Sequence, residues 1–143
     1  MGKPLTLLDA NALIAVICAE PAMDQVVGIL RRGSVAMTTA NIAEAYDKSS
    51  RRARLSHAQV ADVIEPLFAG PLTPISVDVD LARRAGEIRS LHYHRKRLPL
   101  SLADSVLLAA PGPGDQIATS DSGVLTLAAK LGIETIELPR STG

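Results

Sequence analysis

The stretch that decides the fold is PLTLLDANALIAVICA, at residues 4–19. Its first part, residues 4–8, is short and apolar, which predicts a buried strand that ends at Asp9. Residues 11–19 predict a helix that stops at Glu20-Pro21, because proline cannot continue a helix. A buried strand that leads directly into a helix is how a parallel α/β sheet begins.

The same alternation continues along the chain. Further short apolar strands are predicted at residues 35–38, 72–77, 116–119 and 133–138. Helices are predicted at residues 22–32, 39–54, 56–70, 78–91, 101–110 and 121–131. We therefore expect one α/β domain over residues 1–139, with a parallel sheet of about four to five strands and helices on both faces. A short C-terminal tail, residues 140–143, follows it.

Local signals fix several element ends. Gly33 predicts a helix C-terminal cap, whereas Thr39 and Ser56 predict N-terminal caps. Pro74 places its strand at an edge of the sheet, because proline donates no backbone hydrogen bond. The helix opened by Asp78 is expected to bury one stripe, made of Leu81, Ala85, Ile88 and Leu91.

Composition narrows the class of function. Lys plus Arg and Asp plus Glu each total 15, so the net charge is zero, which argues against a protein that coats duplex DNA. The only aromatic residues are Tyr46, Phe68 and Tyr93, too few for a platform that stacks single strands. One cysteine, no long apolar run and no signal peptide lead us to expect a cytoplasmic protein.

Two acidic residues follow predicted strands. Asp9 ends the first strand and Asp121 follows the fourth. In open parallel sheets, active sites form at the carboxyl ends of the strands, so both residues are candidates for a shared site. Aspartate at a strand-to-helix junction is also a good helix N-cap, which leaves each residue a purely structural alternative.

Asp104 is the only charged residue in SLADSVLLAA, residues 101–110. Leu107 and Leu108 lie on the same helix face, and an ionised carboxylate beside buried leucines is costly unless it is paired or binds a metal. The alternative is a capping box, in which Ser101 caps the helix and Asp104 bonds back to it. The two roles are compatible, and the sequence favours neither.

Glu44 belongs to a charged stripe on the helix predicted at residues 39–54. It shares this stripe with Asp47, Lys48 and Arg51, and such a stripe is usually a solvated face. Alternatively, the stripe begins at a site and leads away into basic residues that steer RNA. Lys48, Arg51 and Arg52 are the candidates for that role, and residues 92–97 form a second basic segment.

Four motifs occur in a set order: LLDANALI at residues 7–14, TTANIAE at 38–44, LPLSLAD at 98–104 and IATSD at 117–121. With Gly132-Ile133 and the ending IELP, the chain resembles the PIN-domain family, and within it the VapC-type toxins. The resemblance implies a catalytic and metal-binding quartet of Asp9, Glu44, Asp104 and Asp121. It also implies Asn11 and Thr119 as polar residues that support the site.

The resemblance further implies an endoribonuclease. Four carboxylates repel one another, and hard oxygen ligands suit Mg²⁺ or Mn²⁺, which can polarise a phosphoryl oxygen and activate water. RNA would be the substrate, and a VapB-type antitoxin would inhibit the enzyme. The first two helices carry more apolar residues than one core stripe needs, which fits a homodimer or a groove for a partner helix.

Three alternatives stay open. A housekeeping PIN-domain nuclease would carry the same acidic quartet. A non-catalytic binding module on a PIN scaffold would be expected to have lost part of it, and this chain has an acid at all four positions. A phosphoaspartyl enzyme using Asp9 would normally carry a second aspartate where Asn11 stands.

Overall fold

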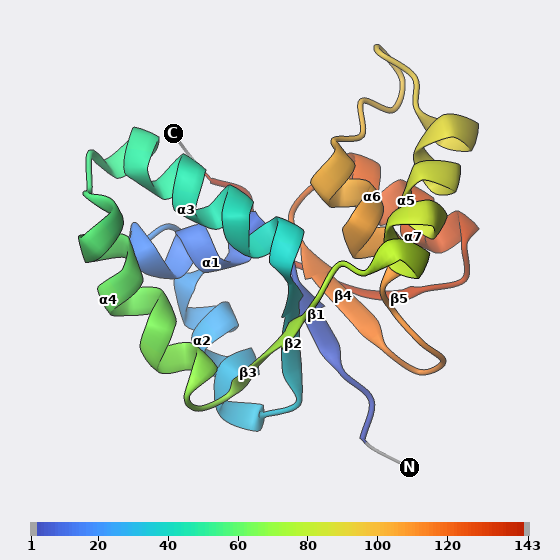
Figure 1. The fold of residues 1–143 in the computed structure, drawn as a ribbon. Helices are drawn as coiled ribbons and strands as arrows, with labels where there is room; N and C mark the ends of the chain where they lie inside the picture. Colours follow the sequence, from blue (N-terminus) through green and yellow to red (C-terminus); the bar gives the residue numbers. More distant parts are fainter. Residues whose placement is uncertain (1–2, 142–143) are drawn as a thin grey trace.

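The computed structural model describes residues 3–141, so residues 142 and 143 of the predicted tail lie outside the described part of the chain. Five parallel strands form one sheet in the order β3-β2-β1-β4-β5 (Figure 1). The strands are β1 Thr6–Leu8, β2 Val35–Thr38, β3 Leu72–Ile75, β4 Gln116–Thr119 and β5 Glu134–Glu137. The predicted fold class is confirmed, and β1 is the central strand.

Helices cover both faces of this sheet (Figure 1). One face carries α1 Ala10–Ile17, α2 Met23–Arg32, α3 Thr39–Ala53 and α4 His57–Phe68. The other carries α5 Val79–His92, α6 Leu102–Ala109 and α7 Ser122–Lys130. None of the helices in the described part of the chain is long and apolar enough to cross a membrane.

Neighbouring strand residues pack into different cores, one on each face of the sheet. Leu7 lies with Ala36 and Ile117 in the core beneath α6 and α7. Leu8 lies with Met37 in the core beneath α1, α2 and α4. Because successive strand side chains point to opposite faces and both faces are covered, neighbouring positions of the central strand, such as Leu7 and Leu8, are both apolar. The edge strand β5 is mostly exposed, and three of its four residues are polar.

The apolar residues of α1 and α2 mostly fill the core. The buried ones are Ala10, Ala12, Leu13, Ile14, Ala15, Val26, Ile29 and Leu30. Val16, Ile17 and Val27 are half-buried. The surplus of apolar surface expected from the sequence is therefore small on these two helices.

Most of the predicted element ends are confirmed. Gly33 caps α2 with a φ of 81°, and Ser56 forms a capping box with Gln59 at the start of α4. Pro74 lies in β3, which is an edge strand. Asp78 caps α5, as expected.

Two local predictions were wrong. Thr38, and not Thr39, caps α3: its hydroxyl oxygen accepts a hydrogen bond from Asn41 N at 3.1 Å. Both residues are threonines that can cap a helix, and the fold uses the last residue of β2. Leu91 is 72% exposed, although it continues the stripe of Leu81 and Ala85. It is exposed because α5 has 14 residues and packs against α6, which has only 8.

We predict opposite effects of alanine at two glycines of this region. Gly33 adopts φ 81° and ψ −178°, a conformation that only glycine adopts readily. Gly33→Ala should therefore lower the free energy of unfolding by about 1–3 kcal/mol. Gly28 lies inside α2 with nothing within 4 Å of an added Cβ. Gly28→Ala should raise the free energy of unfolding by about 0.5–1 kcal/mol. Urea unfolding of both variants tests this, and equal effects would contradict it.

Candidate active site

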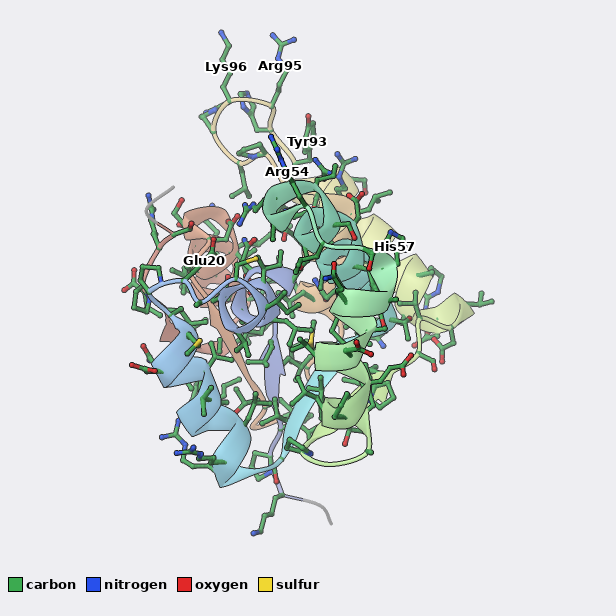
Figure 2. All side chains as sticks on the ribbon, turned by 90° about the vertical axis from the view of Figure 1, so that its left-hand side faces the viewer. Glu20, Arg54, His57, Tyr93, Arg95 and Lys96 are labelled. Carbon is green, nitrogen blue, oxygen red and sulfur yellow. The ribbon has the colours of Figure 1, made fainter. Side chains whose placement is uncertain are left out.

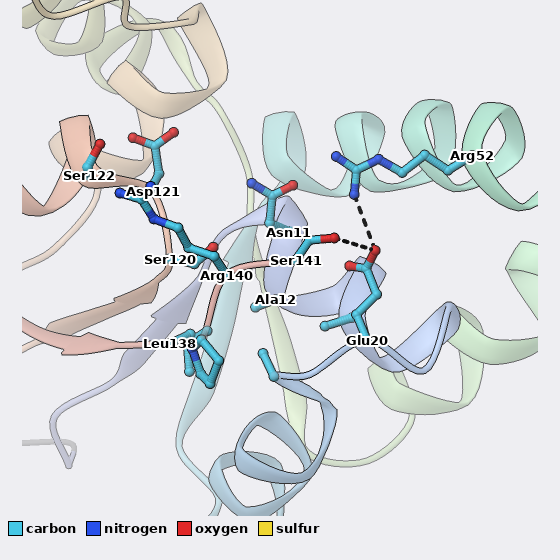
Figure 3. Close-up of a pocket in the computed structure, with 13 residues that line it drawn as sticks. Asn11, Ala12, Glu20, Arg52, Ser120, Asp121, Ser122, Leu138, Arg140 and Ser141 are labelled. Atoms are coloured by element: carbon cyan, nitrogen blue, oxygen red, sulfur yellow. Dashed lines mark hydrogen bonds and ion pairs between the residues drawn. The ribbon is translucent and has the colours of Figure 1, made fainter. Parts of the chain in front are cut away.

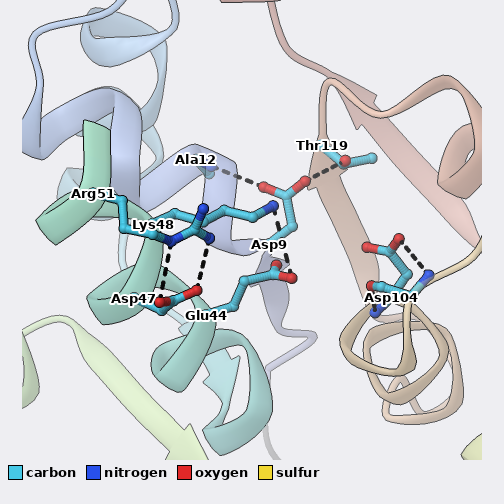
Figure 4. Close-up of polar contacts among 9 residues, drawn as sticks. Asp9, Ala12, Glu44, Asp47, Lys48, Arg51, Asp104 and Thr119 are labelled. Carbon is cyan, nitrogen blue, oxygen red and sulfur yellow. Dashed lines mark hydrogen bonds and ion pairs between the residues drawn. The ribbon is translucent and has the colours of Figure 1, made fainter. Parts of the chain in front are cut away.

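The structure brings all four predicted acids to the carboxyl ends of the central strands. Asp9 directly follows β1 and Asp121 follows β4, while Glu44 lies on α3 and Asp104 on α6. The negative charges of Asp104 and Asp121 raise the pKa of both Asp9 and Glu44, which shows that the four groups share one electrostatic environment. Figure 4 shows Asp9, Glu44 and Asp104 around a common space between α3 and α6.

Asp9 is the most deeply buried of the four, with 3% of its surface exposed. One carboxylate oxygen accepts a hydrogen bond from Ala12 N at 2.8 Å and so caps α1. The other accepts from the hydroxyl of Thr119, whose oxygen in turn accepts from Asp121 N at 3.0 Å. Burial raises the pKa of Asp9 to about 6, even though both hydrogen bonds favour the charged form. The predicted supporting position of Thr119 thus ties the ends of β1 and β4 together.

Asp104 and Asp121 both cap helices. Asp104 Oδ2 accepts from Ser101 N at 3.2 Å, completing the capping box, and Asp121 Oδ1 accepts from Val124 N at 3.0 Å. The structural alternatives are therefore confirmed, yet each carboxylate keeps one oxygen that accepts no hydrogen bond from the described residues. Burial is the main cause that raises the pKa of Asp104, and the charge of Asp121 adds to it. Capping orients these groups and leaves them available to a ligand.

Glu44 does not lie on a solvated face. Its side chain is 22% exposed, and burial raises its pKa. The solvated part of the stripe is made by Asp47 and Arg51, which are 63% and 67% exposed. Glu44 is turned inward toward the other acids (Figure 4).

Lys48 supplies positive charge to the acids. Its Nζ lies 3.7 Å from Glu44 Oε2, and its charge lowers the pKa of both Glu44 and Asp104. Sequence reasoning placed Lys48 on a path leading away from the site. The spacing of four residues from Glu44, which favours an ion pair on a helix, could have indicated this contact.

The other two residues expected to steer RNA are also paired. Arg51 donates two hydrogen bonds to Asp47, at 3.2 and 2.8 Å. Arg52, on α3, has its Nη1 atom 3.6 Å from Glu20 Oε2. Ion pairing reduces the positive charge that these side chains offer to a phosphate, so their part in RNA binding stays a prediction.

A cavity of about 290 Å³ opens beside Asp121 (Figure 3). Asn11 and Ser120 line it from the site, whereas Glu20, Arg52 and residues 138–141 line it from the other side. Asn11 Oδ1 is buried and finds no hydrogen-bond partner within residues 3–141. A buried acceptor without a partner fits a cation or a ligand N–H or O–H group. The sequence did not predict that Glu20 and Arg140 line this cavity, because no local pattern indicates that segments distant in the chain meet at this edge of the sheet.

The donor groups fit a hard divalent cation. In the arrangement observed, no three acidic, histidine or cysteine side chains of residues 3–141 lie close enough together to hold one ion. The chemistry of the four acids nevertheless suits a divalent cation. Asp104 and Asp121 each keep one carboxylate oxygen without a hydrogen bond from the described residues, and three of the four acids have raised pKa values. Carboxylates that repel one another without a cation are expected to turn toward their own helix caps.

A family model described as PIN domain matches residues 6–111. The chain belongs to the PIN domain family. The matched segment contains Asp9, Glu44 and Asp104, and Asp121 lies beyond its end. No curated protein matches the chain.

Solved structures share the fold of this PIN domain over most of its length. DNA-bound VapBC from Salmonella typhimurium has a TM-score of 0.69 at 18% identity, covering 94% of this chain and 98% of that one. VapBC2 from Rickettsia felis has 0.65 at 13%, covering 94% and 99%. VapC20 from Mycobacterium tuberculosis has 0.62 at 13%, covering 94% and 89%. At these identities the likeness shows the fold.

We predict that Asp9→Asn stabilises the protein at neutral pH, measured in chelator. Folding raises the pKa of Asp9 from 3.8 to about 6, so the native state binds more protons between these values. Stability contributed by Asp9 is thus lost as pH rises through this window. At pH above 7, Asp9→Asn should therefore unfold with a free energy about 1–3 kcal/mol larger than the wild type.

The pH dependence of the free energy of unfolding distinguishes the cost of burying the Asp9 charge from an effect of altered hydrogen bonding. Well below pH 3.8 the wild-type carboxyl is protonated in both the folded and the unfolded state, so the gain should vanish. Asp62→Asn, an exposed position on α4, serves as the control and should change stability little at either pH. A gain for Asp9→Asn that is equal at both pH values would show that charge burial is not its origin.

Proposed function

We propose that this PIN domain is an endoribonuclease toxin of the VapC type, which hydrolyses RNA phosphodiester bonds with a bound Mg²⁺ or Mn²⁺. The observation that carries the proposal is the buried Asp9 carboxylate in the midst of three further acids at the carboxyl edge of the sheet. Aspartates that only cap helices would stabilise the fold equally well at solvated positions, where burial does not penalise the charge. Structural capping alone therefore does not account for this cluster. The similar VapC20 is described as a toxin that cleaves the Sarcin-Ricin loop.

Asp9, Glu44, Asp104 and Asp121 are the residues that would hold the cation. A divalent cation bound there would supply a Lewis acid able to polarise a phosphoryl oxygen and to lower the pKa of water. Thr119 fixes the Asp9 carboxylate by its hydrogen bond. Hydrogen bonds from Ser101 N and Val124 N orient Asp104 and Asp121. Binding of one ion by all four acids would require them to move closer together, since no three of these side chains lie close enough in the described residues.

A covalent route through Asp9 fits poorly. Both of its oxygens already accept hydrogen bonds, and only 3% of its surface is exposed. A nucleophilic carboxylate needs an open line of approach to phosphorus. The geometry therefore favours direct attack by water over a phosphoaspartyl intermediate.

We further propose that a VapB-type antitoxin inhibits this enzyme, as the names of the similar VapBC structures suggest for those proteins. The carboxylates would attract an Arg or Lys side chain of a partner, which could bar RNA from the site. The predicted homodimer, and the alternative of a housekeeping nuclease, stay predictions of the sequence.

We predict that Asp104→Asn abolishes RNA cleavage while the protein stays folded. Asparagine can still accept the bond from Ser101 N, so the cap is retained while one ligand charge is lost. The rate on a mixed RNA substrate should fall by about 100-fold or more, because groups that act as a unit fail together. Chelation should stop wild-type cleavage, Mg²⁺ or Mn²⁺ should restore it, and Ca²⁺ should support little turnover.

Asp62→Asn is the matched control and should cleave at the wild-type rate, since this exposed residue lies on α4. The proposal fails if folded Asp104→Asn keeps full activity. It also fails if the wild type cleaves RNA undiminished in chelator, with the absence of metal established by elemental analysis.

A further inference from the structure

The segment between α5 and α6 forms a projecting hairpin. His94 and Leu98 bridge its two sides with reciprocal backbone hydrogen bonds of 2.9 Å. Inside the turn, His94 Nδ1 accepts hydrogen bonds from Lys96 N and Arg97 N, at 3.1 and 3.0 Å. Figure 2 shows Arg95 and Lys96 at the tip, beyond the rest of the molecule. We name residues 93–98 the basic finger.

The basic finger carries positive charge that the fold does not neutralise. Arg95, Lys96 and Arg97 are exposed, and none of them forms an ion pair within the described chain. Five other basic residues each face a carboxylate: Lys48, Arg51, Arg52, Arg83 and Arg84. Ten of the 15 basic residues form no ion pair in the described part of the chain, and three of these are consecutive in the basic finger, which gives a local concentration of positive charge.

The base of the basic finger adjoins the candidate active site. A methyl group on Gly123 would lie 3.3 Å from Leu98 Cδ1 and 3.2 Å from Asp121 Oδ1, so both residues contact the start of α7. From Leu98 the chain runs directly to Ser101, the cap that orients Asp104. In Figure 1 the hairpin rises from the carboxyl edge of the sheet, above α6. An extended molecule held by the finger can therefore continue from its base to the acids.

The electrostatics of the site create a need for such a contact. Four carboxylates repel a polyanion, and Lys48, whose charge acts on Glu44 and Asp104, is engaged by Glu44. A bound divalent cation holds only the phosphate that it contacts, so the rest of an RNA must be attracted elsewhere. The basic side chains of the finger can attract the rest of the RNA without placing positive charge among the acids.

We propose that the basic finger binds the phosphate backbone of the RNA substrate away from the bond that is cleaved. This inference rests on the proposed function. An RNA fits better than an acidic protein segment because the finger and the acids share one edge, so a single extended polyanion can reach both. Backbone contacts of this kind position a nucleic acid without reading its sequence.

The test compares two double variants with the same loss of charge. Arg95→Ala/Lys96→Ala removes the tip of the basic finger. Arg31→Ala/Arg32→Ala removes two exposed arginines that end α2, just before β2 begins and hence at the opposite edge of the sheet. Each variant is assayed on a long RNA and on a tetranucleotide, which offers few phosphates beyond the bond that is cleaved.

For the finger variant on long RNA, KM should rise about tenfold with kcat unchanged, and the slope of log affinity against log salt should shrink by about 1.5. On the tetranucleotide it should match the wild type, and the α2 variant should match the wild type on both substrates.

Unchanged KM and salt slope in the finger variant would overturn the proposal. An equal loss in the α2 variant would do the same, because it would show general attraction. Normal handling of long RNA with lost binding of an acidic protein partner would assign the finger to a protein.

Failure of the proposed function is separable from failure of this inference. If the wild type cleaves neither substrate, binding of the long RNA is measured for all three proteins in chelator. Weaker binding by the finger variant alone would still support the contact, and equal binding by all three would overturn it.

Discussion

Asp9 places a carboxylate at the end of the central strand, where water scarcely reaches it and where two further acids lie within electrostatic range. A buried charge is tolerated only when hydrogen bonds or a counter-ion compensate for it. Ala12 N and the Thr119 hydroxyl supply part of that compensation, yet the pKa still rises to about 6. The proposed cation site rests on this imbalance, because a cation would supply the compensation that the two hydrogen bonds do not.

The fold supports this arrangement from both faces. β1 pairs with β2 and β4, so the segments that follow these three strands meet at one edge. Helices that begin there must be capped, and Asp9 and Asp121 cap them with oxygens that also face the site. Charge is then divided by position: the four acids lie at this edge, Lys48 is paired with Glu44 among them, and three consecutive basic residues without ion pairs in the described chain lie on the basic finger. Zero net charge thus conceals a strongly polarised surface.

Much of this could be predicted from the sequence because it depends on local patterns. Apolar runs identified the strands, and strand ends located Asp9 and Asp121. A lone charge among apolar residues singled out Asp104. Other features depend on contacts between distant segments, which no local pattern encodes. These are the inward turn of Glu44, the charge that Lys48 lends to Asp104, and the closing of a cavity by Arg140. The exposure of Leu91 could not be predicted either, because it depends on the length of the neighbouring helix.

The central claim is that four acids from separate segments form one divalent-cation site. Titration of the protein with Mn²⁺, followed by paramagnetic broadening of backbone amide NMR signals, tests it most directly. We expect the first signals to broaden to be those of residues 9–11, 44, 104 and 119–121, with Arg31 and Arg32 unaffected at the far edge. Initial broadening around the exposed carboxylates of Asp62 or Asp80, with the amides of residues 9 and 104 still sharp, would contradict the account.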